Sequence, residues 1–591
     1  MVEDGRIVNV LPDPEDPVSE GKPCIKGLSI HTLQPKRVTE PLIREGEGEF
    51  SKISWEYALE LIQDKLENTA PDKTGWAGSG EITNEDNYII QKFAREVVGS
   101  DNVDSCARLC HAPTVKAYND MLGVPASPDY ENDIYSIDLL LVVGTNPASN
   151  YPTVFSKIVA ARSKGLKLAC INTWENETGK FADYRIITKP GRMVYVVLGI
   201  LHYLIYEKGM TSEIEGFEDM KHSVAPFDAE TVSRITGVLK EKIVELAEAV
   251  YSAERIGVMH GMKYTQTYHG TDAVKALTSI ALLKNGKIIT ERGKINIQGA
   301  GDVGIAPKYG LTLTEFLTTK PVNFFFTSIF NPARSMPHLN LVWENLRRAF
   351  VVHATPFFND TTKFADVVLP TPLLYEREGT VTIGERRVRY VRRVVDPPAL
   401  ARQEWEFLQE LARGMGVDWE YRSAKDVFYE ITTRVDGYMH IDPETVYSGE
   451  DVFAEKGMRK KRFYALNPRV VEHPGYPYTL FTARRMPHFN TGDLTMSSER
   501  LKGMFSKNVL WMNPKDMERN GLKDGDVVRV ESPVGAIKLA VQASETMPEG
   551  AVATTFHFHD VPVNVLTPLD LDPETKIPAY KTVPVRIVKM A

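Results

Sequence analysis

The sequence predicts a multidomain α/β protein with mostly parallel sheets and a β-barrel near its C-terminus. Its 591 residues are enough for three to five domains. Through most of the chain, short apolar runs alternate with amphipathic stretches, which is typical of parallel strands covered by helices on both faces. After about residue 475 this pattern gives way to closely spaced alternating strands, as in a closed barrel.

The individual elements follow from the local pattern. Residues 54–70 repeat apolar residues at helical spacing behind Ser54, a preferred cap residue. Apolar strands are expected at 138–144 and 166–172, with a helix ending near Lys164 between them, which outlines a strand–helix–strand crossover. Further strands and helices are expected in the following ranges: 255–261, 271–283, 323–330, 340–349, 350–358 and 365–370.

The barrel strands are expected within 524–543, on either side of a Ser-Pro-Val-Gly turn, and at 551–560. We therefore expect one discontinuous α/β domain, a second α/β domain, a linker without clear periodicity and the barrel. Their expected ranges are 46–135 with about 330–436, then 136–329, 437–475 and 476–591.

Composition excludes several classes of protein. Lys and Arg number 70 against 78 Asp and Glu, a net charge of −8, so no basic excess is available for nucleic acid. Four cysteines are too few for a disulfide framework and favour a reducing compartment, the cytoplasm. The longest apolar run, 193–206, is shorter than a membrane-spanning helix requires, and no secretory signal is recognisable at Met1. We expect neither a direct membrane span nor export.

Three glycine-containing loops follow expected strands, at 144–152, 260–270 and 296–304. Parallel sheets bind ligands beyond the carboxyl ends of their strands, where glycines allow phosphates to approach the backbone. The alternative is that these glycines serve tight turns. None of the loops has the GxGxxG or GxxxxGK[ST] spacing, so a simple dinucleotide or P-loop nucleotide site is not favoured.

Cys106 and Cys110 are four residues apart, and on a helix they would share a face and could form a metal-binding pair. A structural zinc site would need a second pair, which the sequence lacks. Cys110, next to His111, is better interpreted as a redox, nucleophilic or single-ligand position. The alternative for both thiols is burial as small hydrophobic residues.

The segment CARLCHAPTV (106–115) resembles the active-site segment of formate dehydrogenases of the molybdopterin oxidoreductase superfamily. In that family the equivalent cysteine or selenocysteine is the protein ligand of molybdenum or tungsten. Other segments resemble further family motifs in family order, so the resemblance covers nearly the whole chain. They are CIKG (24–27), VVGTNPASNYP (142–152), HGMKYTQTYHG (260–270), ERGKINIQGAGDVG (291–304), FNPARSMPHLN (330–340), FADVVLP (364–370), EREGTVT (376–382), TARRMPHFNTGDLT (482–495) and NVLTPLDLDPETKIPAYK (564–581).

The resemblance implies the molybdopterin oxidoreductase fold, with discontinuous parallel-sheet α/β domains and a C-terminal barrel. It implies that Cys110 ligates the metal, that His111 lies beside the substrate and tunes charge or takes a proton, and that Arg292 holds the formate carboxylate. Lys26 would lie between an iron–sulfur cluster and a pterin on the electron path. Two molybdopterin guanine dinucleotides would be bound by the following residues: Gly144, Asn146, Pro147, Gly261, Met262, Gln266, Gln298, Gly299, Glu378, Gly379, Arg484, His488, Thr491, Asn564, Tyr580 and Lys581.

The sequence departs from the family pattern in its iron–sulfur segment. A [4Fe–4S] cluster needs four ligands, but residues 1–45 contain only Cys24. Three explanations are open: the given sequence starts downstream of the other three cysteines, another subunit supplies ligands, or the cluster has been lost. The presence of Cys24 and Lys26 beside an otherwise intact set of motifs favours the first two, and we interpret 1–45 as the remnant of an iron–sulfur domain.

Two further segments bear on the site. Many relatives have Asp-Pro-Arg where residues 172–174 read Asn-Thr-Trp, so the guanosine contact expected there is in doubt. His557 and His559 would share one face of a strand and could suit a metal, but a place in the barrel wall is favoured. Cys106 and Cys170 match no family ligand and are interpreted as structural.

The function expected from the resemblance is that of the catalytic subunit of a molybdenum- or tungsten-dependent formate dehydrogenase. It would oxidise formate to CO2, or catalyse the reverse reaction, and pass two electrons to an iron–sulfur partner, such as a hydrogenase or an NAD(P)- or ferredoxin-linked module. One alternative is an oxygen-atom-transfer reductase such as nitrate reductase, against which His111 and Arg292 argue. Another is a non-catalytic electron-transfer subunit, like the large subunit of respiratory NADH dehydrogenase, that keeps the fold without the pterin.

Overall fold

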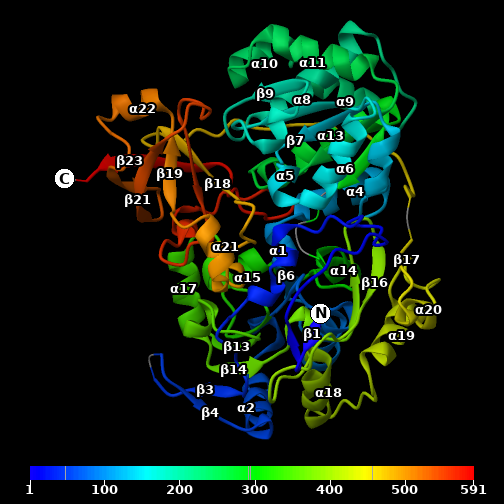
Figure 1. The fold of residues 1–591 in the computed structure, drawn as a ribbon, viewed down its shortest axis with the longest axis vertical. Coiled ribbons are helices and arrows are strands. Elements are labelled where there is room, and N and C mark those ends of the chain that lie inside the picture. The colour runs from blue at the N-terminus through cyan, green and yellow to red at the C-terminus, as the bar shows by residue number, and fades with distance from the viewer. Residues whose placement is uncertain (47, 291, 293–294, 456, 591) are drawn as a thin grey trace. The chain divides into compact units, whose positions relative to one another are not determined.

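The computed structural model describes residues 1–46, 48–290, 292, 295–455 and 457–590 (Figure 1). The chain forms two compact units. The first comprises Met1–Val10, Ile30–Leu109 and Arg292–Lys456, and the second comprises Leu11–Ser29, Cys110–Glu291 and Gly457–Ala591. The chain therefore passes between the units five times.

The first unit is built on a seven-stranded sheet. Its strands lie in the order β4 (Phe50–Lys52), β3 (Leu42–Arg44), β14 (Val367–Pro370), β13 (Phe350–Thr355), β12 (Phe324–Ser328), β5 (Thr74–Gly78) and β6 (Val103–Ser105). The five strands from β14 to β6 are parallel, and β3 and β4 add an antiparallel edge. The apolar runs expected at 323–330, 350–358 and 365–370 are confirmed as the central strands β12 to β14.

Helices and a small second sheet complete this unit. The expected N-terminal helix is confirmed as α2 (Trp55–Glu67), where the side chain of Ser54 accepts a hydrogen bond from the backbone N–H of Tyr57. An antiparallel sheet joins β15 (Gly379–Thr382), β16 (Arg387–Val391) and β17 (Val452–Phe453). The other helices that matter below are α3 (Asn84–Lys92), α14 (Ile297–Asp302), α17 (Leu339–Arg348), α18 (Glu404–Gly414), α19 (Ala424–Arg434) and α20 (Pro443–Ser448).

The second unit contains a five-stranded, fully parallel sheet. Its order is β11 (Lys287–Thr290), β10 (Ile256–His260), β7 (Leu139–Val143), β8 (Lys167–Asn172) and β9 (Tyr184–Ile187). Both faces are covered. Alternate residues of β7 pack against a core that includes α4 (Ala112–Leu122), α8 (Met193–His202) and α13 (Gly270–Lys284), or against α6 (Pro152–Arg162).

The apolar run at 193–206 is explained by this core, because α8 buries all but its last residue. None of the helices in the described part of the chain combines the length and the apolar character that crossing a membrane requires.

The expected C-terminal barrel is confirmed as a closed six-stranded barrel. Its order is β18 (Tyr478–Ala483), β22 (Ala551–Thr555), β19 (Val509–Met512), β21 (Ala536–Ala543), β20 (Val527–Glu531) and β23 (Val583–Lys589). The turn between β20 and β21 is closed by a hydrogen bond from Ser532 N–H to the carbonyl of Gly535.

The strand expected to carry two histidines is shorter than expected. β22 ends at Thr555, so His557 and His559 lie beyond it rather than on one strand face. Beyond the end of the strand, the His557 ring packs against His488, with ring centroids 4.3 Å apart.

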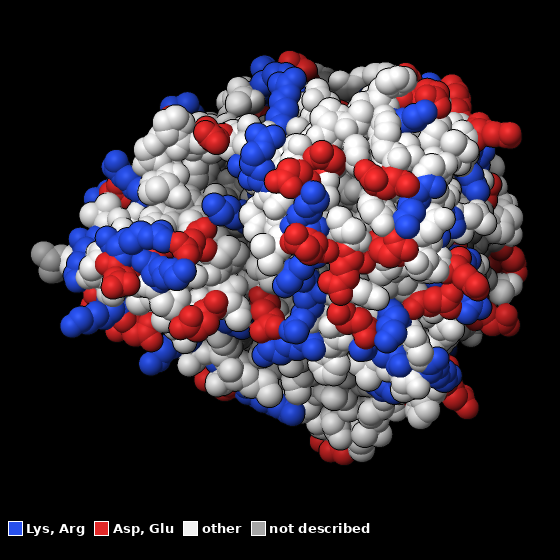
Figure 2. Space-filling model, turned by 90° about the horizontal axis from the view of Figure 1, so that it is seen from above, with Lys and Arg blue, Asp and Glu red and all other residues white. Residues whose placement is uncertain are grey.

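Charges of both signs are interspersed over the face of the molecule that Figure 2 displays.

Candidate functional site

Cys110 lies two residues before α4 in the second unit, close to the loop that follows β10. Its Sγ is 3.8 Å from the Sδ of Met262, and its carbonyl oxygen accepts a hydrogen bond of 3.3 Å from the hydroxyl of Thr265. Both partners belong to α12 (Met262–Thr265), which begins immediately after Gly261. The thiol therefore lies at the carboxyl edge of the parallel sheet, where α/β proteins bind ligands.

The approach of these loops depends on two glycines. A Cβ on Gly261 would lie 2.5 Å from the Cβ of Thr145, and a Cβ on Gly144 would lie 2.7 Å from the backbone nitrogen of Tyr264. Gly144 also has a φ of +64°, a region that glycine adopts without strain. The loops after β7 and β10 can therefore pack directly on each other.

Residues before β23 reach the same place from the barrel. The backbone N–H of Lys581 donates to the carbonyl of Gln266, and its Nζ donates to the carbonyl and hydroxyl of Thr482 at 2.8 and 2.6 Å. Burial raises the pKa of Tyr580, and the charge of Cys110 raises it further. Met262, Gln266, Tyr580 and Lys581, four of the residues that the sequence assigned to cofactor binding, thus lie around Cys110.

His111 is completely buried at the start of α4. Its Nδ1 lies 3.4 Å from the hydroxyl of Thr114, one turn further along the helix. Cys106 belongs to the first unit, where its Sγ accepts a hydrogen bond from the N–H of Gly80. The buried positions of Cys106 and Cys170 agree with structural roles for both thiols.

Positive charges gather around this part of the second unit. Burial lowers the pKa of Lys581 far below its usual value, and Lys263 and Arg484 lower it further, while Cys110 acts in the opposite direction. Burial lowers the pKa of Lys26, whose Nζ donates to the carbonyl of Met486; Cys24 opposes this shift and Arg484 adds to it.

Lys263 and Arg485 belong to the same cluster, and the sequence analysis did not single them out. Burial lowers the pKa of Lys263 to about 7, with Glu177 raising it and Arg485 lowering it. Its Nζ donates to Asn172 Oδ1 and lies 5.0 Å from the centre of the Phe481 ring. The Arg485 guanidinium lies 4.3 Å from the Trp511 ring. The sequence feature that could have identified Lys263 is its position in a glycine-containing loop directly after a strand.

The donor set of this region fits a ligand that carries several negative charges. Burial lowers the pKa values of Lys26, Lys263, Arg485 and Lys581, the charge of Arg484 lowers those of Lys26 and Lys581 further, and Glu177 raises those of Lys263 and Arg485. In the described part of the chain, Arg485 Nε, Thr173 Oγ1 and Asn176 Nδ2 are buried without a hydrogen-bond partner. Diphosphate groups would satisfy both the charge and the unpaired donors.

Residues 172–174, at the end of β8, lack the Asp-Pro-Arg motif that contacts a guanosine in many relatives, and their side chains contact other parts of the second unit. Asn172 accepts from Lys263, and the Trp174 ring meets Phe481 and Trp511 edge-to-face at 5.6 and 5.7 Å. Next to them is a cavity of about 400 Å³, lined in part by Asn172, Trp174, Asn176, Glu175, Arg185 and Lys242. Aromatic and amide side chains thus occupy the position of the family's Asp-Pro-Arg.

Several other predicted residues are engaged in local structure. Asn146 accepts hydrogen bonds from the N–H and hydroxyl of Thr178 and donates to Glu177, and Pro147 begins the short helix α5 (Pro147–Asn150). In the barrel, Arg484 donates to Asn490, and the hydroxyl of Thr491 donates to Asp493. His488 is buried against His557, and Asn564 accepts from Thr567. These residues share the second unit with Cys110.

The remaining predicted residues belong to the first unit. Arg292 is 4% exposed. Gln298 donates to Asp302, while its Oε1 is buried without a partner among the described residues. Glu378 accepts a hydrogen bond of 2.8 Å from the hydroxyl of Tyr390, so its carboxylate is already used within the unit. A Cβ on Gly379 would lie 2.6 Å from Glu85 Oε2, and a Cβ on Gly299 would lie 2.0 Å from Asn84 Oδ1.

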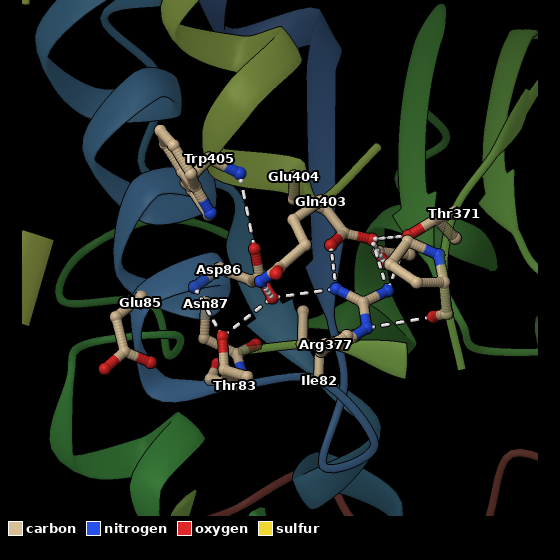
Figure 3. Close-up of polar contacts among 12 residues, drawn as sticks. Ile82, Thr83, Glu85, Asp86, Asn87, Thr371, Arg377, Gln403, Glu404 and Trp405 are labelled. Atoms are coloured by element: carbon tan, nitrogen blue, oxygen red, sulfur yellow. Dashed lines mark hydrogen bonds and ion pairs between the residues drawn. The ribbon is translucent and has the colours of Figure 1, made fainter. Parts of the chain in front are cut away.

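Arg377, which directly precedes Glu378 and Gly379 in the chain, belongs to a buried ionic network (Figure 3). Arg377 donates to the carboxylates of Asp86, at 2.7 Å, and of Glu404, and all three side chains are inaccessible to solvent. Its Nε donates to the carbonyl of Pro372. Burial and the Glu404 charge raise the pKa of Asp86 to about 6, against the effect of Arg377. The network joins α3, α18 and the start of β15, and the sequence analysis did not identify it.

Comparison with known families agrees with this arrangement. The chain belongs to the molybdopterin oxidoreductase family, whose model matches residues 37–414. The model of the molydopterin dinucleotide binding domain matches residues 478–584, which contain nearly the whole barrel. The model of the molybdopterin oxidoreductase Fe4S4 domain matches residues 1–34. The protein is therefore an oxidoreductase of the class that uses molybdopterin dinucleotide and a molybdenum or tungsten ion.

Several individual relatives are formate dehydrogenases. The chain is 32% identical to the F420-dependent formate dehydrogenase subunit alpha of Methanocaldococcus jannaschii, over 100% of this chain and 97% of the relative. It is 27% identical to formate dehydrogenase H of Escherichia coli, over 100% and 94%. Among solved structures, acetylene hydratase from Pelobacter acetylenicus shares the fold, with a TM-score of 0.83 at 18% identity, over 99% and 96% of the two chains.

Proposed function

We propose that the chain is the catalytic subunit of a molybdenum- or tungsten-dependent formate dehydrogenase. The observation that carries the proposal is the convergence of Met262, Gln266, Tyr580 and Lys581 on Cys110 in a region rich in buried cations. A thiolate is a suitable ligand for a soft metal, and the cations suit the phosphates of a dinucleotide. The formate dehydrogenases among the relatives support the choice of substrate.

Oxidation of formate to CO2 releases one proton and two electrons. The bound metal–pterin group supplies the two-electron redox chemistry. In this proposal Cys110 holds the metal, and the Arg292 guanidinium orients the carboxylate through paired hydrogen bonds, a geometry that lysine lacks. His111 takes up the proton, since imidazole titrates near neutral pH.

The electrons would leave one at a time to an iron–sulfur partner subunit, and Lys26 would lie on that path. The match of residues 1–34 to an Fe4S4 domain supports this direction of transfer. Cys24 is the one cysteine within residues 1–34, so a four-ligand cluster at that position would need three ligands besides Cys24. A hydrogenase or an NAD(P)- or ferredoxin-linked module would be a suitable partner.

The test is an anaerobic assay of the purified protein with an artificial electron acceptor, alongside analysis of its metal and pterin. We expect bound molybdenum or tungsten, bound pterin and formate-dependent reduction of the dye. The Cys110→Ala variant should lose activity. Arg292→Ala should raise the formate KM about 10- to 100-fold, because that is the change in affinity expected from losing one charge-assisted pair of hydrogen bonds.

Two outcomes would contradict the proposal. A protein without metal and pterin after anaerobic purification would indicate a non-catalytic subunit. Oxidation of a reduced dye by nitrate, without any reaction with formate, would indicate an oxygen-atom-transfer reductase instead.

A further inference from the structure

Asn296 is a completely buried amide four residues after Arg292, immediately before α14. Its Nδ2 donates to the carbonyl of Ile82 at 2.8 Å, and its Oδ1 accepts from the backbone N–H of Thr382 at 2.8 Å. Its own N–H donates to the carbonyl of Gly80 at 3.0 Å. The residue thus joins the start of α14 to two other parts of the first unit: the loop between β5 and α3, and the end of β15.

The surroundings of Asn296 leave little room for adjustment. The Asn84 amide donates to the hydroxyls of Thr380 and Thr382 at 3.0 Å each. A Cβ on Gly299 would lie 2.1 Å from Asn296 Oδ1, and a Cβ on Gly80 would lie 2.9 Å from the side chain of Ile297. Asn296 and the first turn of α14 therefore pack directly on these two segments, without intervening side-chain bulk at Gly80 and Gly299.

The parts to which Asn296 is bonded are themselves held in place. Thr83 caps α3 by accepting a hydrogen bond from the N–H of Asp86. Glu85 accepts hydrogen bonds of 2.8 Å from the N–H and the hydroxyl of Thr380. Arg377 links Asp86 to Glu404, as Figure 3 shows. Asn296 is therefore bonded to a framework of buried polar contacts rather than to a loosely packed surface.

We infer that Asn296 is a positioning residue for Arg292: its three hydrogen bonds fix the chain four residues after Arg292, and this anchor point sets where the guanidinium can meet the substrate carboxylate. The inference rests on the proposed function of Arg292. A bidentate contact to a carboxylate depends on orientation, and a misplacement of about 1 Å at a reacting group costs up to about 100-fold in rate. Loss of the Asn296 amide should therefore weaken formate binding although Asn296 touches no substrate.

Asn102 provides a matched control in the same unit. It is 5% exposed, its Nδ2 donates to the carbonyls of Asp72 and Thr74, and its Oδ1 accepts from the N–H of Leu311. Asn102→Ala thus removes a similar set of hydrogen bonds to backbone atoms from a different loop. We compare Asn296→Ala and Asn102→Ala in the holoenzyme. Asn296→Asp, which keeps the side-chain volume, is measured in parallel as a second variant that does not depend on the folding of the alanine variant.

We expect all three variants to have a lower melting temperature. Asn296→Ala and Asn296→Asp should raise the formate KM at least tenfold, whereas Asn102→Ala should leave the KM within twofold. Added guanidinium should restore part of the activity of Arg292→Ala, and this rescue should be lost in the Arg292→Ala/Asn296→Ala double variant but kept in Arg292→Ala/Asn102→Ala.

The outcomes separate a failure of the proposed function of Arg292 from a failure of the positioning role of Asn296. If Arg292→Ala itself leaves the formate KM unchanged, the proposed function of Arg292 is wrong. If Arg292→Ala impairs binding but the Asn296 variants have the same KM as Asn102→Ala, or guanidinium rescues both double variants equally, the positioning role of Asn296 is wrong and the function of Arg292 stands.

Discussion

Glu85 and Asp86 are adjacent buried carboxylates at the start of α3 with different partners. Asp86 is neutralised in part by Arg377, whereas the side-chain hydrogen bonds of Glu85 among the described residues come from neutral donors: Thr380 and the hydroxyl of Tyr447. Burial raises the pKa of Glu85 to about 7, although these hydrogen bonds act in the opposite direction. Hydrogen bonding without a counter-charge therefore does not offset the cost of desolvating this carboxylate.

Because the folded state raises the pKa of Glu85, the native protein binds more protons than the unfolded chain between about pH 4.5 and 7. Stability should fall as the pH rises through that window, and the penalty should be fully present above pH 7. We expect the free energy of unfolding of Glu85→Gln, measured relative to that of the wild type, to be higher at pH 8 than at pH 5 by roughly 3 kcal/mol. Urea unfolding at the two pH values measures the difference.

The control is Glu430→Gln, because Glu430 is paired with Lys92 at 2.7 Å and its pKa is lowered, chiefly by hydrogen bonds from Lys92 and Tyr421 that outweigh desolvation. That variant should lose stability relative to the wild type at pH 8. A gap between Glu85→Gln and the wild type that is the same at both pH values would show that Glu85 is ionised at pH 5.

The helix α12 illustrates how one short element supplies several functions. It begins after β10, presents Met262 to Cys110 and carries Lys263 into the cluster with Trp174 and Arg485. Aromatic faces and one amide stabilise the Lys263 cation in place of a carboxylate. Because burial lowers the pKa of Lys263 to about 7, an anionic ligand bound there would favour the charged form of this lysine.

In the cofactor-free protein, the lowered pKa of Lys263 means that its burial costs stability below about pH 7, and this cost disappears as the pH rises toward 10.5. We expect Lys263→Met to be more stable than the wild type at pH 6, on the order of 2 kcal/mol, with the difference shrinking at pH 9. The same variant should retain less pterin and metal after purification. Thermal unfolding and elemental analysis provide the two measurements.

Lys275→Met is the matched control in the same unit. Lys275 is also buried, but it is paired with Glu574 at 2.9 Å and with Asp120 at 3.5 Å. Its replacement should lower stability, since two carboxylates would lose one of their basic partners and keep only Lys116 among the described residues. If Lys263→Met is destabilised to the same extent as Lys275→Met, Lys263 has a partner that outweighs its burial.

Helices and strands could be predicted from the sequence where neighbouring residues alone determine them. The apolar runs of β7, β8, β10 and β12 and the Ser54 cap of α2 identify strands and a helix from a few neighbouring residues. The Arg377 network could not be predicted, because Asp86 lies 291 residues from Arg377 and has the composition of an exposed helix start. Lys263 and Arg485 were missed for the same reason: aromatic rings from distant segments create their environment.

The sequence motifs predicted which residues lie near Cys110 better than they predicted which of their atoms are free to bind a ligand. Met262, Gln266, Tyr580 and Lys581 do lie around Cys110, but Glu378 is bonded to Tyr390 and His488 is packed on His557. A motif specifies that a residue belongs to a site, whereas local hydrogen bonds decide which of its atoms are available to a ligand. Which atoms are available can be decided only when the hydrogen-bond partners in the folded structure are known.

At the scale of the whole molecule, the buried cations of the second unit make its stability dependent on its ligand. A ligand that binds only the folded state stabilises it by RT ln(1 + [L]/Kd), about 4 kcal/mol at a thousandfold excess over Kd. We expect the loaded protein to melt at least about 5 °C above the cofactor-free protein. Differential scanning calorimetry of both forms measures the shift.

Inorganic phosphate or GMP alone should give a smaller increase, because each supplies only part of the dinucleotide. Equal melting temperatures of the loaded and cofactor-free forms would contradict a role of the cations in cofactor binding.

The hydrogen bond between Lys581 and Gln266 also has a consequence for biosynthesis. In the chain, 471 residues separate Lys581 from Cys110, and at ribosomal rates of about 5 to 20 residues per second their synthesis takes roughly 25 to 95 s. Throughout that interval the nascent chain carries Cys110 without the barrel residues that later surround it. Insertion of the cofactor is therefore expected to follow synthesis of β23, which completes the barrel.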